Sequence, residues 1–222
     1  MKNVLITGVS KGIGKALAQK FLQEGYFVFG TSRDGKVDFT NANLSIHQLE
    51  LTSTASIVKC SSEIINSKKK VDILINNAGG LFDEEETTVI PEKLRQTLEV
   101  NLIGPIDFTE RILSEVNIGG HIINVSSTAG SLSLAGHESH FEGHYPAYKI
   151  SKTAVNMYTR TLALRLKDKI AVSSVHPGWV KTDMGGQEAD VTPEEAASNI
   201  FKLAISNPES GQFWFNGEKL AW

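Results

Sequence analysis

Short runs of apolar residues alternate with longer segments of helical periodicity along the whole chain. The short runs are typical of buried strands, and an apolar position every three or four residues is typical of an amphipathic helix. The alternation predicts a parallel sheet with crossover helices, and no linker or repeat interrupts it. We therefore expect a single doubly wound α/β domain over residues 1–222, with about seven strands and helices on both faces. The expected strands are NVLIT, YFVFGT, SIHQLEL, VDILINN, GGHIINVSS, IAVSSVHP and QFWFN, and the expected helices are GKALAQKFLQEG, SIVKCSSEIINS, PEKLRQTLEVNLIGPIDFTERILSEV, AYKISKTAVNMYTRTLALRLKD and TPEEAASNIFKLAIS.

The composition argues against several classes of protein. The chain has 22 Lys and Arg against 25 Asp and Glu, so its net charge of −3 gives no field for binding nucleic acid. No apolar run approaches the ~20 residues of a membrane span, and MKNVLITG leads into a strand without a signal peptide. We expect a cytoplasmic protein with no membrane partner. The acidic run DEEE at 83–86 is interpreted as a solvated loop.

A glycine-rich turn follows the first expected strand and opens the first expected helix. The stretch ITGVSKGIGKAL has glycines at positions 8, 12 and 14. Gly8 permits a tight turn, Gly12 lets the backbone approach a pyrophosphate, and Gly14 lets the helix pack against the strand. The free N–H groups of the helix then face the anion. The position of this turn at the start of the series predicts nucleotide binding.

The stretch HYPAYKISK contains two tyrosines, each with a lysine four residues later. Within a helix this spacing places the lysine beside the tyrosine, where a cation favours the phenolate. Pro146 suits the first position of a helix, which leaves Tyr145 outside it. The helical geometry then applies to Tyr148 and Lys152. Tyr148 is the predicted proton donor or acceptor.

Six motifs follow one another along the chain in the order typical of the short-chain dehydrogenase/reductase family, and together they make the chain resemble that family. They are TGxxxGxG at the glycine-rich turn, NNAG at 76–79, the asparagine of VNLIG at 101, NVSS at 124–127, YKISK at 148–152 and PGWVKT at 177–182. The resemblance covers nearly the whole chain. A lengthened segment between Ser127 and Tyr148 and the phrase PGWVKTDM place it nearest the carbonyl reductase, Sniffer-like and C-factor-like branch of that family.

The resemblance implies a Rossmann-type fold and a hydride transfer between a nicotinamide and a carbonyl or alcohol carbon. Tyr148 would exchange a proton with the substrate oxygen, and Lys152 would lower the pKa of the phenol and bind the nicotinamide ribose. Ser127, the second serine of NVSS, would hold the substrate oxygen. Asn101 would help a chain of waters to reach Lys152.

Two basic residues favour NADP over NAD. The second strand ends in FGTSRDG, where Arg33 suits a 2′-phosphate and Asp34 comes one place too late to bind a ribose hydroxyl. Lys11, just before the second glycine, marks NADP in the family. Glu50 stands where the family usually has Asp near the adenine. The expected cofactor-binding residues are Thr7, Gly8, Ser10, Lys11, Gly12, Ile13, Gly14, Ser32, Arg33, Glu50, Leu51, Asn77, Ala78, Gly79, Tyr148, Lys152, Pro177, Gly178, Val180 and Thr182.

The segment 131–145 is expected to govern the choice of substrate. No Asp or Cys completes a metal site with its histidines at 137, 140 and 144, and no expected helix aligns their rings, so no metal is expected. The expected substrate contacts are Ser127, Phe141, His144, Tyr145 and Trp179.

The leading hypothesis is an NADPH-dependent reductase of aldehydes or ketones with a small carbonyl compound as its partner. One alternative is a 3-oxoacyl thioester reductase of lipid synthesis, which shares the catalytic residues. Another is a signalling protein that only binds the nucleotide. A homodimer, a homotetramer and a monomer are all compatible with the sequence.

Overall fold

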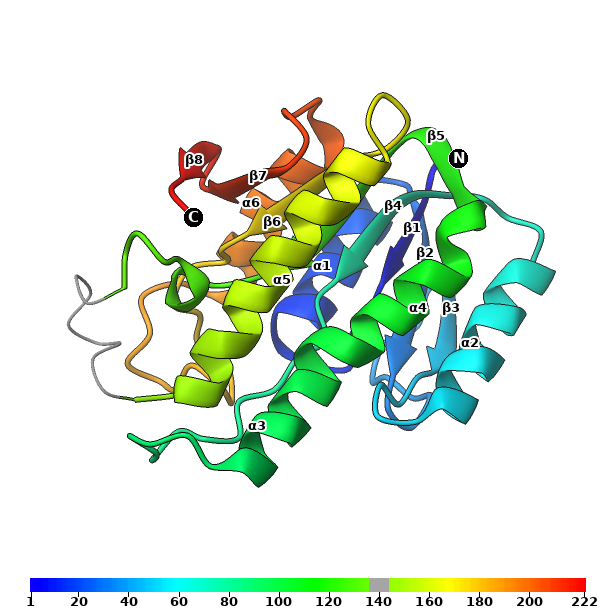
Figure 1. Ribbon diagram of the computed structural model, residues 1–222. Helices are drawn as coiled ribbons and strands as arrows, with labels where there is room; N and C mark the ends of the chain where they lie inside the picture. Colours follow the sequence, from blue (N-terminus) through cyan, green and yellow to red (C-terminus); the bar gives the residue numbers. More distant parts are fainter. Residues whose placement is uncertain (136–143) are drawn as a thin grey trace.

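The computed structural model describes residues 1–135 and 144–222 and is built around one sheet (Figure 1). Its eight strands lie in the order β3-β2-β1-β4-β5-β6-β7-β8, and every neighbouring pair is parallel except β7 and β8. The chain builds outward from β1 to β3 and then returns to place β4 on the other side of β1. This is the predicted doubly wound topology. The strands are β1 (Asn3–Ile6), β2 (Phe27–Ser32), β3 (Leu44–Gln48), β4 (Val71–Asn76), β5 (Val116–Val125), β6 (Ala171–Val175), β7 (Gln212–Phe215) and β8 (Glu218–Leu220).

Helices cover both faces of the sheet (Figure 1). On one face α1 and α6 pack through Phe21 and Phe201, and on the other α2, α4 and α5 enclose a second core that includes Cys60, Phe108 and Leu162. In the described ranges, the helices are all too short or too polar to cross a membrane. The bounds are α1 (Gly12–Gln23), α2 (Thr54–Asn66), α3 (Pro91–Leu98), α4 (Gly104–Ile112), α5 (Pro146–Arg165) and α6 (Pro193–Ile205).

The long helix expected over 91–116 is interrupted. A π-helical turn, Glu99–Ile103, separates α3 from α4, and a 3₁₀ turn precedes β5. Pro105 has no N–H to offer the carbonyl of Asn101, so the regular α-helical ladder cannot continue there. The π turn carries Asn101 into the protein, where the residue is 4% exposed.

The eighth strand was not predicted. It forms a hairpin with β7 through Asn216 and Gly217, both of which have positive φ values, 49° and 84°. Two left-handed residues between antiparallel strands make a tight turn for which Asn-Gly is the favoured pair. The sequence FNGEKL therefore carried the signal for this strand.

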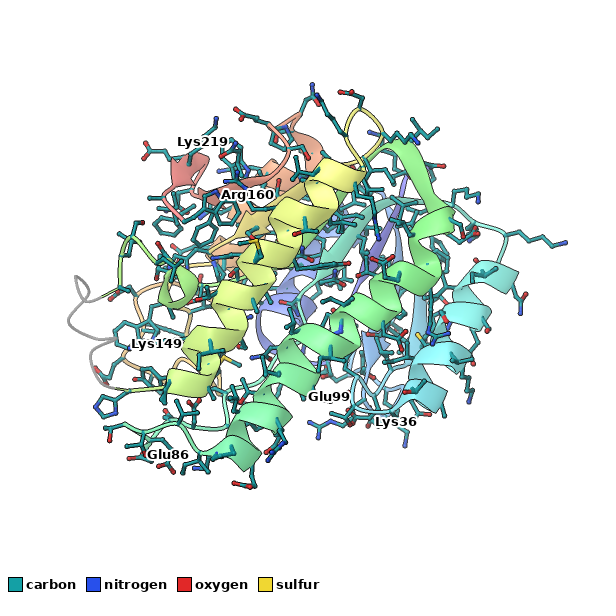
Figure 2. The ribbon with its side chains drawn as sticks, viewed as in Figure 1. Lys36, Glu86, Glu99, Lys149, Arg160 and Lys219 are labelled. Atoms are coloured by element: carbon teal, nitrogen blue, oxygen red, sulfur yellow. The ribbon has the colours of Figure 1, made fainter. Side chains whose placement is uncertain are left out.

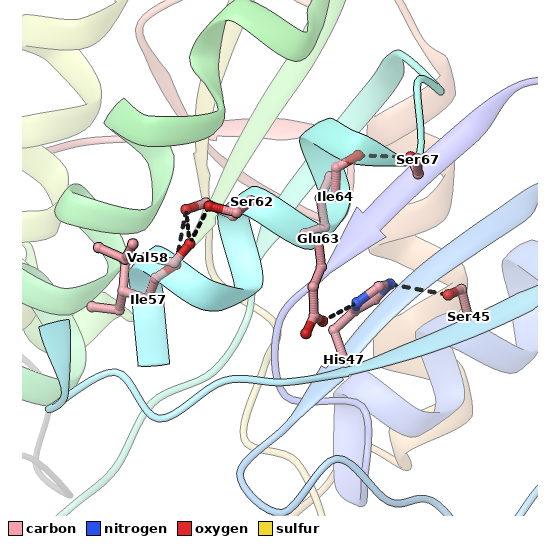
Figure 3. Close-up of polar contacts among 9 residues, drawn as sticks. Ser45, His47, Ile57, Val58, Ser62, Glu63, Ile64 and Ser67 are labelled. Atoms are coloured by element: carbon pink, nitrogen blue, oxygen red, sulfur yellow. Dashed lines mark hydrogen bonds and ion pairs between the residues drawn. The ribbon is translucent and has the colours of Figure 1, made fainter. Parts of the chain in front are cut away.

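The edge strand β3 is fastened to α2 by polar side chains (Figure 3). His47 Nδ1 lies 2.8 Å from Glu63 Oε2, and His47 Nε2 lies 3.0 Å from Ser45 Oγ. At the end of the helix, the Ser67 hydroxyl donates to the carbonyl of Ile64 at 2.6 Å. An edge strand has a backbone partner on one side only, so the contact of His47 with Glu63 supplements its anchorage.

Candidate active site

The glycine-rich turn has the geometry that a phosphate cradle needs. Gly8 and Gly12 have φ values of 74° and 55°, which side-chain-bearing residues rarely adopt. A Cβ atom on Gly14 would lie 2.0 Å from the carbonyl oxygen of Gly8, so only glycine fits at this crossing of turn and helix. Helix α1 begins at Gly12, and its first N–H groups are free of helical partners. The glycine-rich turn therefore has the backbone conformation that such a cradle requires.

The NNAG segment after β4 is bonded to this turn. The hydroxyl of Thr7 accepts hydrogen bonds from the N–H groups of Asn77 and Ala78, both at 3.0 Å. The side-chain amide of Asn77 donates to the carbonyls of Thr7 at 2.9 Å and Gly8 at 3.1 Å. These bonds join the carboxyl ends of β1 and β4, the switch point at which doubly wound proteins bind their ligands. Gly79 lies next to this point and faces Asn101 and Lys152.

Tyr148 and Ser127 meet at the carboxyl end of β5. Helix α5 begins at Pro146 with Tyr145 outside it, as predicted, and Tyr148 lies in its first turn. The phenol forms a hydrogen bond with the Ser127 hydroxyl. Ser127 also accepts a bond from the N–H of Ala129 at 3.1 Å, which leaves its own proton free to donate. Two hydroxyl groups thus face the same point.

Lys152 lies one helical turn beyond Tyr148 and is 6% exposed. Its Nζ donates to the carbonyl of Val125 at 2.9 Å and lies 5.5 Å from the centre of the Tyr148 ring. Burial lowers the pKa of Lys152 to about 8.

The pKa of the Tyr148 phenol moves opposite to our expectation. Burial raises it to about 12, and the hydrogen bond from Ser127 opposes this rise only in part. Lys152 does not contribute the expected lowering of this pKa, and its ammonium group donates to the carbonyl of Val125. A neutral phenol at physiological pH is suited to donating a proton.

Asn101 is held by three hydrogen bonds beside Lys152. Its side chain accepts from the N–H of Gly80 at 2.7 Å and donates to the Gly80 carbonyl at 2.9 Å and to the Ser151 hydroxyl at 3.1 Å. A cavity of about 10 Å³ is lined by Asn101 and Lys152 together with Asn76. This volume is close to that required by one buried water molecule.

A cleft of about 270 Å³ opens between α5, the segment after β4 and the segment after β6. It includes the predicted substrate residues Ser127, Tyr145 and Trp179; the His144 ring lies 5.7 Å from that of Tyr145, and position 141 falls outside the described residues. Sequence reasoning missed His176, although it directly precedes the PGWVKT motif. The lining residues are Ile13, Leu81, Glu84, Ser126, Ser127, Tyr145, Tyr148, His176, Pro177, Gly178, Trp179, Val180, Thr182, Met184 and Gly185.

The acidic segment 83–86 is not the solvated loop that the sequence indicated. Asp83 is 1% exposed, and its Oδ2 accepts a hydrogen bond from the N–H of Ala147 at 2.6 Å. The carboxylate is buried because it meets the start of α5, 64 positions away in the chain. Glu84, by contrast, is exposed and lies at the cleft.

Both basic residues expected at the cofactor face carboxylates. Lys11 Nζ lies 2.5 Å from Asp183 Oδ2, and Arg33 Nε lies 3.9 Å from Glu50 Oε2. Lys11 and Arg33 are exposed, with 74% and 84% of their side-chain surfaces open to solvent. The remaining expected contacts lie nearby along the strand ends: Ser10 is exposed, Ser32 accepts a bond from the N–H of Lys36, and Leu51 is buried.

Within the described ranges, no three His, Cys, Asp or Glu side chains gather as a metal site would require. The histidines at 137 and 140 lie outside those ranges.

The comparisons with known proteins agree with this geometry. The model of the short chain dehydrogenase family matches residues 2–193, and the chain belongs to that family. It is 28% identical over 260 residues to carbonyl reductase [NADPH] 1 of Mus musculus, covering 94% of each chain.

Two solved structures extend the likeness to the whole chain. The NADPH-bound carbonyl reductase from chicken fatty liver superposes with a TM-score of 0.88 at 30% identity, covering 100% of this chain and 99% of the other. The carbonyl reductase Sniffer of D. melanogaster gives a TM-score of 0.87 at 28% identity, with 100% of both chains covered. The chain is similar to carbonyl reductases in sequence and in fold.

Proposed function

We propose that the protein is an NADPH-dependent reductase that converts a small aldehyde or ketone into an alcohol. The observation that carries the proposal is the hydrogen-bonded pair of Ser127 and Tyr148, which faces a cleft next to the glycine-rich turn. The relatives that bear the name carbonyl reductase support the same reaction. The cleft, at about 270 Å³, suits a small substrate.

The residues at the switch point fit a dinucleotide. The turn around Gly8 and Gly12 would hold the pyrophosphate, Arg33 and Lys11 would meet a 2′-phosphate, and Lys152 would bind the nicotinamide ribose. When bound, the cofactor supplies a hydride to the carbonyl carbon. Glu50 and Asp183 compete with the phosphate for the two cations, so part of the binding energy is spent on separating these pairs.

The chain supplies the proton. Ser127 donates a hydrogen bond to the substrate oxygen and stabilises the negative charge that develops there. Tyr148 donates its phenolic proton to that oxygen, so the product is an alcohol and the residue is left as a phenolate. The cavity lined by Lys152 and Asn101 offers a place for a water that would return a proton to the phenolate.

Replacement of one hydroxyl group tests this proposal. Tyr148→Phe keeps the ring and removes the proton, so carbonyl-dependent oxidation of NADPH should fall by about 10²- to 10⁴-fold while NADPH still binds. The control is Tyr26→Phe, which removes a phenol hydroxyl from the opposite side of the sheet. A panel of aldehydes, ketones, quinones and an acyl thioester should be assayed with both nicotinamide cofactors.

Two results would contradict the proposal. One is a wild-type protein that oxidises NADPH with none of these carbonyl compounds. The other is a Tyr148→Phe variant that keeps more than a tenth of the activity. A strong preference for the acyl thioester would instead favour a reductase of lipid synthesis.

A further inference from the structure

The segment Asp83–Glu86 lies against the start of the helix that carries Tyr148 and Lys152. The segment is itself a turn, since the N–H of Glu86 donates to the carbonyl of Asp83 at 3.0 Å. In Figure 2, Glu86 is labelled just before α3, close to the N-terminal end of α5, where Lys149 is labelled. The contacts between this turn and α5 have no counterpart in the motifs of the sequence.

The first contact is a helix cap supplied from outside the helix. The residue at the N-cap of α5, Tyr145, makes no side-chain bond to the first turn. Asp83 takes over this role and accepts the N–H of Ala147 at 2.6 Å. A carboxylate at a helix N-terminus gains from both the hydrogen bond and the helix dipole. Because Asp83 is 1% exposed, water cannot readily replace it.

The second contact fixes the residue before the helix. Tyr145 has the left-handed conformation, with φ 58° and ψ 44°, and its N–H donates to the carbonyl of Glu86 at 3.2 Å. A side-chain-bearing residue keeps this conformation only where its surroundings enforce it. Glu86 is itself held by Lys93 of α3, with Nζ and Oε1 2.5 Å apart.

Together these contacts set the position of the phenol. Tyr148 follows Ala147 directly, while its partner Ser127 comes from the end of β5. The start of α5 must therefore be held in place relative to the sheet for the two hydroxyl groups to converge. Leu81 and Glu84, on either side of Asp83, line the cleft. The same segment thus joins the cleft wall to the helix of the proton donor.

We infer that Asp83 is a positioning residue, which caps α5 from the neighbouring segment and holds Tyr148 at its working distance from the substrate oxygen. The inference rests on the proposed function, since it assigns Tyr148 the proton transfer. Asp83 itself takes no part in the proton transfer.

Three substitutions at this position distinguish the effect of losing the cap from the effects of changing the volume or the charge of the side chain. Asp83→Leu keeps a similar volume but has no acceptor, and Asp83→Ala is made in parallel in case one of the two folds poorly. In both, kcat should fall by about tenfold to a hundredfold, because a small displacement of a reacting group has effects of this size. The dissociation constant for NADPH should stay within about threefold of wild type. Asp83→Asn keeps an acceptor oxygen and should recover most of kcat.

Ser53→Ala is the matched control. Ser53 caps α2, and its hydroxyl accepts the N–H of Ser56 at 3.3 Å. This variant also removes one cap from a helix, but from one that carries none of the proposed active-site residues. It should lower the melting temperature and leave kcat unchanged.

Amide hydrogen exchange at Ala147 tests the cap without any assay of activity. Exchange should accelerate in Asp83→Leu and Asp83→Ala and remain slow in Asp83→Asn. Unchanged exchange in the two apolar variants, or a wild-type kcat in them, would overturn the inference. So would a loss of kcat in Asp83→Asn as large as in Asp83→Leu. A wild-type protein inactive with every carbonyl compound would overturn the proposed function, and the exchange result would then decide on the cap alone.

Discussion

Burial acts on the two titratable groups of the site in opposite directions. The pKa of Lys152 falls from its ordinary value of 10.5 to about 8, and that of Tyr148 rises from 10.0 to about 12. Desolvation penalises the charged form in both cases. At a pH between these two pKa values, both side chains are neutral in the folded protein. The enclosure of the site therefore suppresses two charges that solvent would otherwise support.

The lowered pKa of Lys152 makes stability depend on pH. Below about pH 8 the lysine is charged in both states, and the folded state bears the cost of burying that charge. Between pH 8 and 10.5 the folded protein releases the proton while the unfolded chain keeps it, so this residue's contribution raises the free energy of unfolding with pH. Lys152→Met lacks this dependence. Its free energy of unfolding relative to wild type should be highest near pH 7 and decline by on the order of 2–3 kcal/mol towards pH 10.5.

Urea denaturation at several pH values measures this difference. Lys59→Met, which removes a charge from an exposed position on α2, should follow the wild-type curve. A constant difference between Lys152→Met and wild type across this range would show that the ammonium group is not desolvated in the folded protein.

The residues of the site differ in how well a sequence reveals them. Tyr148 could be chosen over Tyr145 because Pro146 marks the start of a helix locally. The burial of Asp83 could not be found in this way. A run of acidic residues is usually solvated, and this carboxylate is buried only because the fold brings the start of a distant helix to it. The direction of the Tyr148 pKa shift was predicted wrongly for the same reason, since it depends on the groups that surround the phenol in the folded protein.

At the level of elements, the site depends on the close approach of α5 and the 3₁₀ turn Thr128–Gly130. A Cβ atom on Gly130 would lie 2.4 Å from the carbonyl carbon of Lys152 and 2.6 Å from the N–H nitrogen of Thr153. Both neighbours are backbone atoms of α5, so they cannot yield without moving the helix. Glycine therefore sets the distance between Ser127 and Tyr148.

Gly130→Ala should push α5 away from the turn. We expect a loss of roughly 1–3 kcal/mol in stability, as is usual for overpacking, together with a clear loss of kcat. Gly119→Ala is the control, because its Cβ atom would meet nothing within 4 Å but its φ of 82° makes the change costly. Thermal unfolding and kcat measured together would show whether only the first variant loses activity beyond its loss of stability. Equal kcat values in the two variants would contradict the prediction.

Elements with a regular apolar pattern were predictable, and those defined by a single local event were not. The seven runs all became strands, and central ones such as β1 and β4 are apolar because both of their faces are buried. Strand β8 is short and mostly exposed, so it has no such pattern. Only the Asn216-Gly217 turn in the sequence indicates it. The π turn likewise depends on a single residue, Pro105, within an otherwise helical sequence.

At the scale of the whole molecule, the proposed cofactor site joins parts of the chain that are far apart in sequence. The turn at Gly8 and the residues around Thr182 belong to opposite ends of the matched family region, yet a Cβ atom on Gly12 would lie 3.2 Å from a Thr182 carbon. A ligand that bridges them stabilises the folded state as a unit. NADPH at 100 times its dissociation constant should contribute about 2.7 kcal/mol. For a protein of this size this corresponds to an increase of about 5–10 °C in Tm.

NADH at the same concentration should raise Tm less, because it offers no 2′-phosphate to Arg33 and Lys11. Arg33→Ala should reduce the difference between the Tm shifts produced by NADPH and NADH. Arg95→Ala, which removes an exposed arginine from α3, should leave this difference unchanged. Differential scanning fluorimetry measures these shifts. Equal shifts with NADPH and NADH in the wild-type protein would show that the two cations do not select the cofactor.

The short hairpin at the end of the sheet also bears on aggregation. Without β8, the strand Gln212–Phe215 would be an edge strand, with unpaired backbone groups beside three aromatic side chains. Such an edge can pair with the same strand of another molecule. The hairpin replaces it with a three-residue strand bearing Glu218 and Lys219, both exposed. Charged side chains on a short outer strand oppose this pairing, so removing residues 218–222 should increase light scattering on heating well below the melting temperature.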